Sequence, residues 1–322
     1  MKNLADIINK VHCADCLEFM RDMPDECVDC VVTSPPYYGL RDYGVDGQIG
    51  LEPTMKEYIA RLAEVFGECK RVLKKTGTIW VNIGDSYAGT GDKGGWLDPK
   101  YPNGRTGQAK SINRMVKGVQ EKSLCQVPER LSLALTDELG LIKRNTIIWY
   151  KRNCMPSSVG DRFTVDFEYL YFFAKSKNYW FEQQFEQGNF DAHKMQSYHK
   201  PNNPKYESAA DERWKDQFDG RSWGSVGVRN KRTVWDIPTE SFGEAHFAVF
   251  PRALVYTPIK AGCPPNGIVL DPFAGSGTTC LEAKEKGKNY IGIELNPEYL
   301  NIAEKRLRQE VLPLGYVQGA LK

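Results

Sequence analysis

Short apolar stretches alternate with segments of helical periodicity along most of this chain, and this alternation constrains its fold more than any other feature. Strands are predicted at 28–33, 78–83, 145–150, 169–174, 268–270 and 290–293, and helices at 54–74, 128–139 and 278–287. Alternation of this kind is typical of α/β proteins, in which helices cover both faces of a mostly parallel sheet. The predicted fold class is therefore a doubly wound, mostly parallel α/β sheet.

The length of 322 residues allows two domains, or one large α/β domain that carries an insertion. Hydrophobic residues make up 41% of the chain and charged residues 26%, which is the composition of a globular protein. No apolar run approaches the roughly 18 residues that a membrane helix needs, and the first residues lack a signal-peptide core. The chain is therefore expected in the cytoplasm with no membrane partner, where its nine cysteines would be reduced thiols.

Positive charge is concentrated in two stretches, although the net charge of the whole chain is only +2. Residues 88–126 and 193–232 each contain more basic than acidic residues, and both are predicted insertions into the α/β pattern, the first of them a long loop. Charge alone leaves two solvated loops as an alternative. The second stretch, however, interleaves its basic residues with Tyr198, Tyr206, Trp214, Phe218 and Trp223. Basic side chains contact phosphates and aromatic rings stack on bases, so a nucleic-acid partner is favoured. The candidate contacts are Arg221, Arg229, Lys231 and Arg232.

A glycine-containing loop, Asp271–Thr279, lies between a predicted strand and a predicted helix. Gly275 and Gly277 allow the backbone to approach a ligand closely, and Glu294 ends the next strand, where a carboxylate can accept hydrogen bonds from ribose hydroxyls. The position of the third glycine of a dinucleotide fingerprint holds Cys280, which argues against an NAD-dependent dehydrogenase. The loop therefore predicts a nucleoside cofactor without a pyrophosphate, and a plain strand-to-helix turn is the alternative.

A second motif, Thr33-Ser34-Pro35-Pro36-Tyr37, follows another apolar strand at the end where sites gather in open α/β sheets. The two prolines stiffen the backbone, which would present the Ser34 hydroxyl, the Pro35 carbonyl and the Tyr37 ring. Two acceptors beside a stacking ring suit a planar group that bears an exocyclic amine. The alternatives are a turn that ends the strand and a Pro-Pro-x-Tyr peptide ligand, which would need an exposed extended segment.

Together, Asp271–Thr279 and Ser34–Tyr37 resemble the motifs of the amino-group DNA methyltransferases, which methylate cytosine N4 or adenine N6 with S-adenosylmethionine. The early position of the Ser-Pro-Pro-Tyr motif and the late position of the glycine loop are similar to the beta group of this family. The resemblance implies a permuted, Rossmann-like methyltransferase sheet. It also implies a catalytic half at 1–190 that contains the basic loop 88–126, a target-recognition insertion at 191–245, and a cofactor-binding half at 246–322.

The resemblance also implies roles for individual residues. Thr278 and Thr279 open the helix whose amides would bind the methionine carboxylate, and Glu294 would bind the ribose. Asp15 is similar to the residue that contacts the adenine amine, and His246 lies in the segment that surrounds the methionine end. The other residues of the cofactor loop are Asp271, Phe273, Gly275 and Gly277, and the catalytic residues are Ser34, Pro35, Pro36 and Tyr37.

The reaction implied is direct methyl transfer to the amine of a base that has been flipped out of duplex DNA. No covalent intermediate is expected, since the chain has no Pro-Cys dipeptide of the cytosine-C5 enzymes. Ser-Pro-Pro-Tyr resembles the cytosine-N4 version of the motif, and adenine N6 is the alternative. An RNA or protein amine methyltransferase is a rival with the same chemistry. The expected partner is duplex DNA, with a separate cognate restriction endonuclease as a second candidate, for a monomer or homodimer.

Two cysteine pairs, Cys13-x-x-Cys16 and Cys27-x-x-Cys30, form a pattern that can bind zinc. The ten residues between the pairs are fewer than the usual spacing. In addition, Cys30 lies within a predicted apolar strand and Asp15 is already assigned to the cofactor site. Four ordinary thiols and no metal are therefore expected. A zinc-dependent DNA-binding module without enzymatic activity is the alternative.

Overall fold

The computed structural model describes residues 2–39, 41–42, 44–89, 110–111, 116–157, 159–187, 228–240 and 250–308. The chain divides into two units. One consists of Met1–Glu182 with Val234–Lys322, and the other of Gln183–Thr233. The larger unit contains the central sheet and is called the sheet unit below. Within the described residues, no helix combines the length and apolar character needed to cross a membrane.

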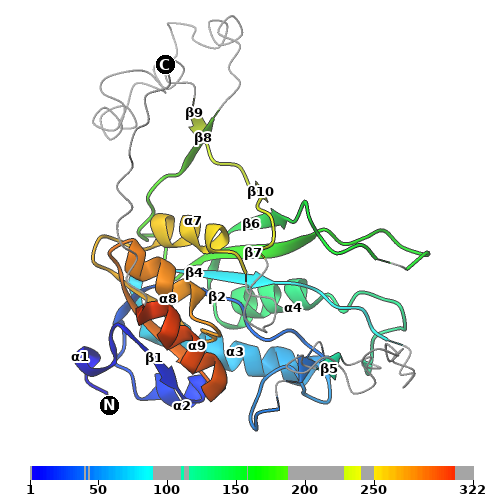
Figure 1. Ribbon diagram of the computed structural model, residues 1–322, viewed down its shortest axis with the longest axis horizontal. Coiled ribbons are helices and arrows are strands. Elements are labelled where there is room, and N and C mark those ends of the chain that lie inside the picture. Colours follow the sequence, from blue (N-terminus) through cyan, green and yellow to red (C-terminus); the bar gives the residue numbers. More distant parts are fainter. Residues whose placement is uncertain are drawn as a thin grey trace, which may run out of the picture. The chain divides into compact units, whose positions relative to one another are not determined.

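The sheet unit is built on eight strands in the order β1-β12-β11-β2-β4-β7-β6-β10 (Figure 1). Seven strands point the same way, and only β7 runs antiparallel to its neighbours β4 and β6. The strands are β1 (Lys10–Cys13), β2 (Val28–Thr33), β4 (Leu73–Ile83), β6 (Ile142–Tyr150), β7 (Phe167–Ala174), β10 (Val234–Asp236), β11 (Ile268–Asp271) and β12 (Asn289–Glu294). This arrangement confirms the predicted α/β class and its mostly parallel sheet.

Helices cover both faces of the sheet (Figure 1). One apolar cluster joins one face to α1 (Leu4–Ile7), α2 (Cys16–Arg21), α3 (Met55–Val72) and α4 (Val127–Leu133). A second cluster joins the other face to α7 (Arg252–Gly262), α8 (Thr278–Glu285) and α9 (Pro297–Arg308). α3 begins with a capping box in which the Thr54 hydroxyl accepts from the Glu57 amide, and the Glu57 carboxylate accepts from the Thr54 amide.

The predicted strands and helices correspond to observed elements, with one change of helix type. The helix predicted at 128–139 ends as an α-helix at Leu133 and continues as a π-helix, Ala134–Glu138. β10 and α7 were not predicted from the sequence. β10 has only three residues, and α7 contains Pro258 in its interior, which weakened its helical pattern.

The second unit, Gln183–Thr233, is described only at its two ends, where β8 (Phe185–Gln187) pairs antiparallel with β9 (Val228–Asn230). Most of the predicted insertion 191–245, including Arg221, lies outside the described residues, as does His246. Val234–Asp236 falls inside the predicted insertion, but as β10 it pairs with β6 and extends the central sheet. The basic loop 88–126 is described only in part. Its Lys110–Ser111 (β5) pairs with Arg41–Asp42 (β3).

Candidate active site

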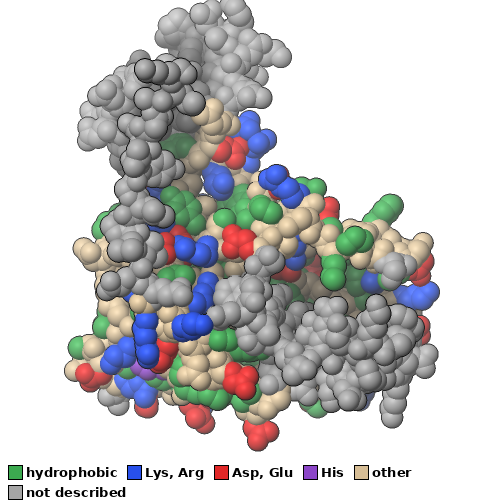
Figure 2. Space-filling view, in the orientation of Figure 1, with side chains coloured by type: hydrophobic (Ala, Val, Ile, Leu, Met, Phe, Trp, Pro, Cys, Tyr) green, Lys and Arg blue, Asp and Glu red, His purple; other side chains and the backbone are tan. Residues whose placement is uncertain are grey.

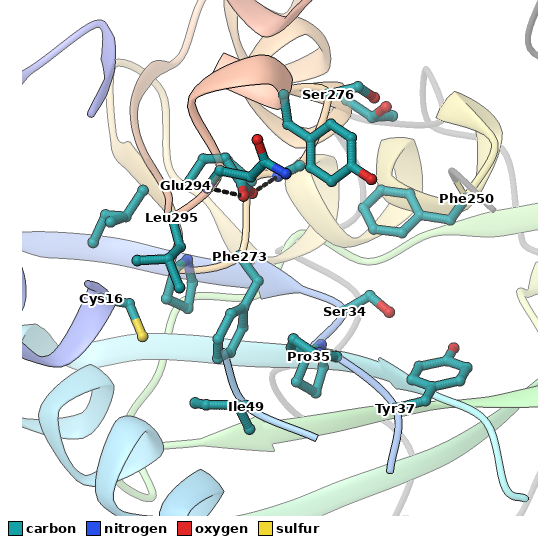
Figure 3. Close-up of a pocket in the computed structure, with 18 of the residues that line it drawn as sticks. Cys16, Ser34, Pro35, Tyr37, Ile49, Phe250, Phe273, Ser276, Glu294 and Leu295 are labelled. Atoms are coloured by element: carbon teal, nitrogen blue, oxygen red, sulfur yellow. Dashed lines mark hydrogen bonds between the residues drawn. The ribbon is translucent and has the colours of Figure 1, made fainter. Parts of the chain in front are cut away.

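A cavity of about 340 Å³ in the sheet unit brings the two sequence motifs together. It lies where β2, β11 and β12 end, the edge of an open α/β sheet at which ligands bind. Figure 3 shows Glu294 and Phe273 on one side of it, and Ser34, Pro35 and Tyr37 on the other. Nine of the predicted site residues line it: Asp15, Ser34, Pro35, Pro36, Tyr37, Phe273, Gly275, Thr278 and Glu294.

The carboxylate of Glu294 is held at the end of β12 by two backbone amides. Its Oε2 accepts from Gly275 N at 2.8 Å, and its Oε1 accepts from Asn296 N at 2.8 Å (Figure 3). Burial raises the pKa of this carboxyl group, and the two amides oppose the shift. A carboxylate oxygen can accept more than one hydrogen bond, so Glu294 can also receive a pair of neighbouring hydroxyl groups.

Gly275 leaves room for a ligand beside this carboxylate. Its φ is +52°, and a Cβ atom built there would meet nothing within 4 Å. Gly277 serves packing instead, because its φ is +77° and a Cβ would lie 2.9 Å from Ala303 Cβ on α9. The positive φ favours glycine at both positions, and the close contact with Ala303 is a second reason for glycine at Gly277.

An apolar pocket for a flat ring lies next to Glu294. Its walls include Phe273 from the glycine loop, Ile49, Leu295 and Cys16 (Figure 3). Asp15 borders the same region, but its Oδ1 caps α2 by accepting from Leu17 N at 2.9 Å and Glu18 N at 3.0 Å. The other oxygen, Oδ2, lies 3.8 Å from Arg61 Nη2 and is the atom of Asp15 best placed to accept a further hydrogen bond.

The guanidinium group of Arg306 contacts the start of α8, where the glycine loop ends. Arg306 Nη1 on α9 donates to Ser276 O at 2.7 Å, to Ser276 Oγ at 2.8 Å and to Thr278 Oγ1 at 3.0 Å. The helix N-terminus and this guanidinium both favour a negatively charged group nearby. Thr278 and Thr279 are both buried, but only Thr278 belongs to the lining of the cavity.

Asp271 lies beneath the cavity and is not part of its lining. The residue is 1% exposed, and its Oδ1 accepts from Thr33 Oγ1 at 2.6 Å and from Phe273 N at 3.0 Å. The Thr33 bond ties the end of β2 to the end of β11, so Asp271 joins the two motifs from below. Burial raises the pKa of Asp271 to about 6, although these hydrogen bonds partly oppose the shift.

Asp271→Asn is expected to remove a pH-dependent cost to stability. The pKa of this carboxyl group is near 3.8 in the unfolded chain and about 6 in the folded chain, so the folded chain holds the proton more tightly. The free energy of unfolding therefore falls as the pH rises from about 3.8 to about 6. The difference between the two pKa values corresponds to a loss of about 3 kcal/mol in the free energy of unfolding, and about 2 kcal/mol of this loss occurs between pH 4.5 and 7.5. Urea unfolding of both proteins across this range should therefore show the wild type losing about 2 kcal/mol relative to the variant. Parallel pH profiles would contradict this account.

The other side of the cavity is formed by the Ser34–Tyr37 motif. The Pro36 carbonyl already accepts from the hydroxyl of the buried Tyr58 at 2.7 Å, which fixes the turn after β2. The Tyr37 hydroxyl donates to Glu168 Oε2 at 2.7 Å. Burial and the neighbouring Glu168 carboxylate raise the pKa of Tyr37 well above its ordinary value, so the phenol stays protonated.

Phe250, which also lines the cavity, belongs to the segment that the sequence resemblance assigns to the methionine end, whereas several other lining residues were not predicted, among them Ile49, Asn82, Trp149, Lys151, Glu168 and Leu295. Asn82, Trp149 and Lys151 lie at or just after the carboxyl ends of β4 and β6, which is a signal that could have been used. Glu168 lies near the start of β7 and reaches the same edge because this strand runs in the opposite direction. Ile49 belongs to a connecting segment and carries no comparable signal.

The two cysteine pairs do not meet at one point. Cys16 and Cys27 belong to the apolar cluster on one face of the sheet, whereas Cys30 belongs to the cluster on the other face. Burial raises the pKa of Cys16 to about 12 and that of Cys30 well above its ordinary value, so both thiols stay protonated. Within the described part of the chain, no three potential ligands among His, Cys, Asp and Glu are grouped to hold a metal ion.

Three of the predicted DNA contacts lie in the described part of the second unit. Arg229 Nε contacts Glu186 Oε1 at 2.9 Å, and Arg232 Nε contacts the same oxygen at 2.5 Å. The Lys231 amide donates to Gln184 O at 2.9 Å. Figure 2 shows basic side chains on both sides of an acidic one where β8 and β9 lie in Figure 1. Glu186 therefore balances part of the positive charge of this strand pair.

The doubly wound sheet with one reversed strand, and a glycine loop facing a Ser-Pro-Pro-Tyr turn, define a methyltransferase. The family model described as "DNA methylase" matches residues 28–305, and the chain belongs to this N6/N4 DNA methylase family. Enzymes of the family take the methyl group from S-adenosylmethionine.

Two curated relatives are similar over most of their length. The chain is 40% identical to the type II methyltransferase M.Cfr9I of Citrobacter freundii over 296 residues, which is 92% of this chain and 86% of the relative. It is also 40% identical to M.SmaI of Serratia marcescens over 299 residues, which is 92% of this chain and 90% of the relative.

Solved structures of lower sequence identity share the fold. The cytosine-N4-specific PvuII DNA methyltransferase is 19% identical, with a TM-score of 0.60 over 94% of this chain and 87% of its own. TTHA0409 of Thermus thermophilus, solved in complex with S-adenosylmethionine, is 22% identical, with a TM-score of 0.54 over 94% of this chain and 96% of its own.

Proposed function

We propose that this enzyme transfers a methyl group from S-adenosylmethionine to the exocyclic N4 amine of a cytosine in double-stranded DNA. The proposal rests on one observation: two sequence motifs that lie about 240 residues apart in the chain line the same cavity. One motif offers acceptors and an aromatic ring for a base, and the other offers a carboxylate, an apolar slot and a helix N-terminus for a nucleoside with a charged tail.

The residues on the cofactor side fit S-adenosylmethionine in each of its parts. Glu294 would accept from the two ribose hydroxyls, and Phe273 and Ile49 would enclose the adenine ring. Asp15 Oδ2 would accept from the adenine amine. The start of α8, supported by Arg306, would bind the methionine carboxylate. When bound, the cofactor supplies a methyl group on a positively charged sulfur, which leaves as a neutral thioether.

On the substrate side, the chain positions the base and holds its amine. The Tyr37 ring would stack on a base flipped out of the duplex, while Ser34 Oγ and the Pro35 carbonyl would accept from its amine. Held by these two acceptors, the amine nitrogen would present its lone pair to the methyl group that the cofactor would supply. The methylated nitrogen loses its extra proton to solvent. Positioning of the nitrogen in line with the methyl group supplies much of the rate.

The choice of cytosine N4 is supported by Ser34 at the first position of the motif. An uncharged hydroxyl there resembles the cytosine-N4 version, and the PvuII enzyme of the same fold is described as cytosine-N4-specific. Adenine presents the same kind of amine, so methylation of adenine N6 is the second candidate.

The identity of the modified base tests the proposal directly. Mixed-sequence unmethylated duplex DNA would be incubated with the enzyme and S-adenosylmethionine, digested to nucleosides, and analysed by mass spectrometry. N4-methylcytosine is the expected product. N6-methyladenine would overturn the choice of base and keep the cofactor site, whereas bound cofactor without either product would overturn the DNA substrate.

We also propose that the unit Gln183–Thr233 contributes to DNA recognition. Replacing Lys231 and Arg232 together with alanine should weaken DNA binding and reduce the slope of log affinity against log salt by about 1 to 2, because each lost phosphate contact releases fewer counterions. Glu186→Gln should act in the opposite direction, since it frees Arg229 and Arg232 from their carboxylate. Filter binding over a salt series measures both slopes.

The matched control for these variants is Lys177→Ala, which removes an exposed lysine from the sheet unit. This variant should keep the wild-type slope. An unchanged slope of log affinity against log salt in the double variant would show that Lys231 and Arg232 do not contact DNA phosphates. It would also count against a DNA-binding role for β8 and β9.

A further inference from the structure

Glu168 is the centre of a hydrogen-bond network on the substrate side of the cavity. Its Oε2 accepts from the Tyr37 hydroxyl at 2.7 Å and from Asn82 Nδ2 at 3.1 Å, and its Oε1 accepts from Lys151 Nζ. The side chains of Glu168 and Lys151 are only 17% and 18% exposed. All four residues line the cavity, so this network faces the space that the substrate would enter.

The topology of the sheet explains how this network forms. Tyr37 follows β2, Asn82 lies near the end of β4, and Lys151 follows β6, so all three lie at the carboxyl edge of the parallel strands. Glu168 reaches this edge as the second residue of the antiparallel β7, which lies between β4 and β6. One carboxylate therefore receives donors from three different strand ends.

The surroundings fix the geometry of this carboxylate tightly. A Cβ atom at Gly84 would lie 2.8 Å from Tyr37 Cε2 and 3.3 Å from Glu168 Cγ, so only glycine allows both side chains to keep their places. Asn82 is held in turn by a second bond from Nδ2 to Tyr169 O at 3.0 Å. The Lys151 ammonium also lies 4.7 Å from the centre of the Trp149 ring.

We propose that Glu168 is a positioning residue that holds the Tyr37 ring and the Lys151 ammonium against the target base. The inference rests on the proposed function. An ammonium carries three donors, so Lys151 can donate to Glu168 and also to the ring nitrogen acceptor beside the base amine. That bond would turn the amine toward Ser34 and the Pro35 carbonyl. Removing two charges from water costs free energy that their mutual attraction often does not exceed, so a partly buried ion pair adds little to stability. A functional role therefore explains the pair at this position better than a role in stability.

Glu168→Gln separates positioning from a general structural role. The amide can still accept from Tyr37 but no longer balances the charge of Lys151. Misplacement of reacting groups by about 1 Å costs up to about 10²-fold, so the single-turnover methylation rate at saturating DNA should fall roughly 10- to 100-fold. The dissociation constant of S-adenosylmethionine, measured by calorimetry, should stay within about twofold of the wild-type value, because the cofactor side is untouched. Glu304→Gln, which alters an exposed ion pair on α9, is the matched control.

A double-mutant cycle with Lys151→Met supplies the second readout. If Glu168 acts by holding Lys151, then Glu168→Gln should have a much smaller effect in the Lys151→Met background than in the wild type. Full multiplication of the two effects would overturn the proposal, as would a wild-type rate in Glu168→Gln. Weakened cofactor binding in that variant would show a structural defect and would also overturn it. Failure of the wild type to methylate DNA would instead overturn the proposed function.

Discussion

Glu294→Ala is expected to lower the affinity for S-adenosylmethionine roughly 10³-fold. The carboxylate is the one acidic group at the end of β12 that the structure aims into the cavity, and two backbone amides hold it there. Each hydrogen bond between a neutral group and a charged one contributes about 1.5–3 kcal/mol, so losing two from the ribose costs about 3–6 kcal/mol. Removal of the carboxylate also leaves Gly275 N without its partner and loosens the loop.

The measurement is calorimetric titration with S-adenosylmethionine, with Glu298→Ala as the matched control. Glu298 is exposed at the start of α9, only four residues further along, and its loss should leave the affinity within about twofold. Glu294→Gln should give an intermediate loss, since its amide group can accept through only one of the two atoms. A wild-type dissociation constant for Glu294→Ala would refute the placement of the ribose at this carboxylate.

The central strands of the fold could be predicted because burial on both faces leaves them almost entirely apolar. Residues 28–33 and 268–270 are examples, and the structure places them side by side as β2 and β11. The edge elements could not be predicted in the same way. β1 has only four residues with one buried side chain, and β10 has three, so tertiary pairing rather than local pattern determines them.

The site shows the same division between local motifs and tertiary contacts. Ser34–Tyr37 and the glycine loop are contiguous in sequence, so their chemistry could be inferred before their positions were known. Glu168 and Lys151 join the site only through the strand order, which no local pattern encodes. Asp271 shows the converse, since it belongs to the cofactor motif but lies beneath the cavity, where it bonds to Thr33. A motif therefore identifies a loop more reliably than it assigns a contact to each of its residues.

Ser34→Ala is expected to lower the single-turnover methylation rate roughly 10²- to 10³-fold while leaving cofactor affinity nearly unchanged. Ser34 lines the cavity at the end of β2, on the side opposite Glu294 (Figure 3). Its hydroxyl would accept from the amine as positive charge develops on the attacking nitrogen. An interaction of this kind strengthens in the transition state, and loss of one such group typically costs 10²- to 10³-fold in rate.

Rapid-quench kinetics with a saturating duplex substrate measures this rate, and calorimetry measures the dissociation constant of S-adenosylmethionine. Ser176→Ala is the control, because among the described residues that hydroxyl bonds within its own turn, to Asn178. A loss confined to the rate would place Ser34 at the reacting amine, since a group that binds substrate equally in the ground and transition states would change affinity instead. A variant that methylates at the wild-type rate would show that the Pro35 carbonyl is enough to orient the amine, and the role assigned to the hydroxyl would be wrong.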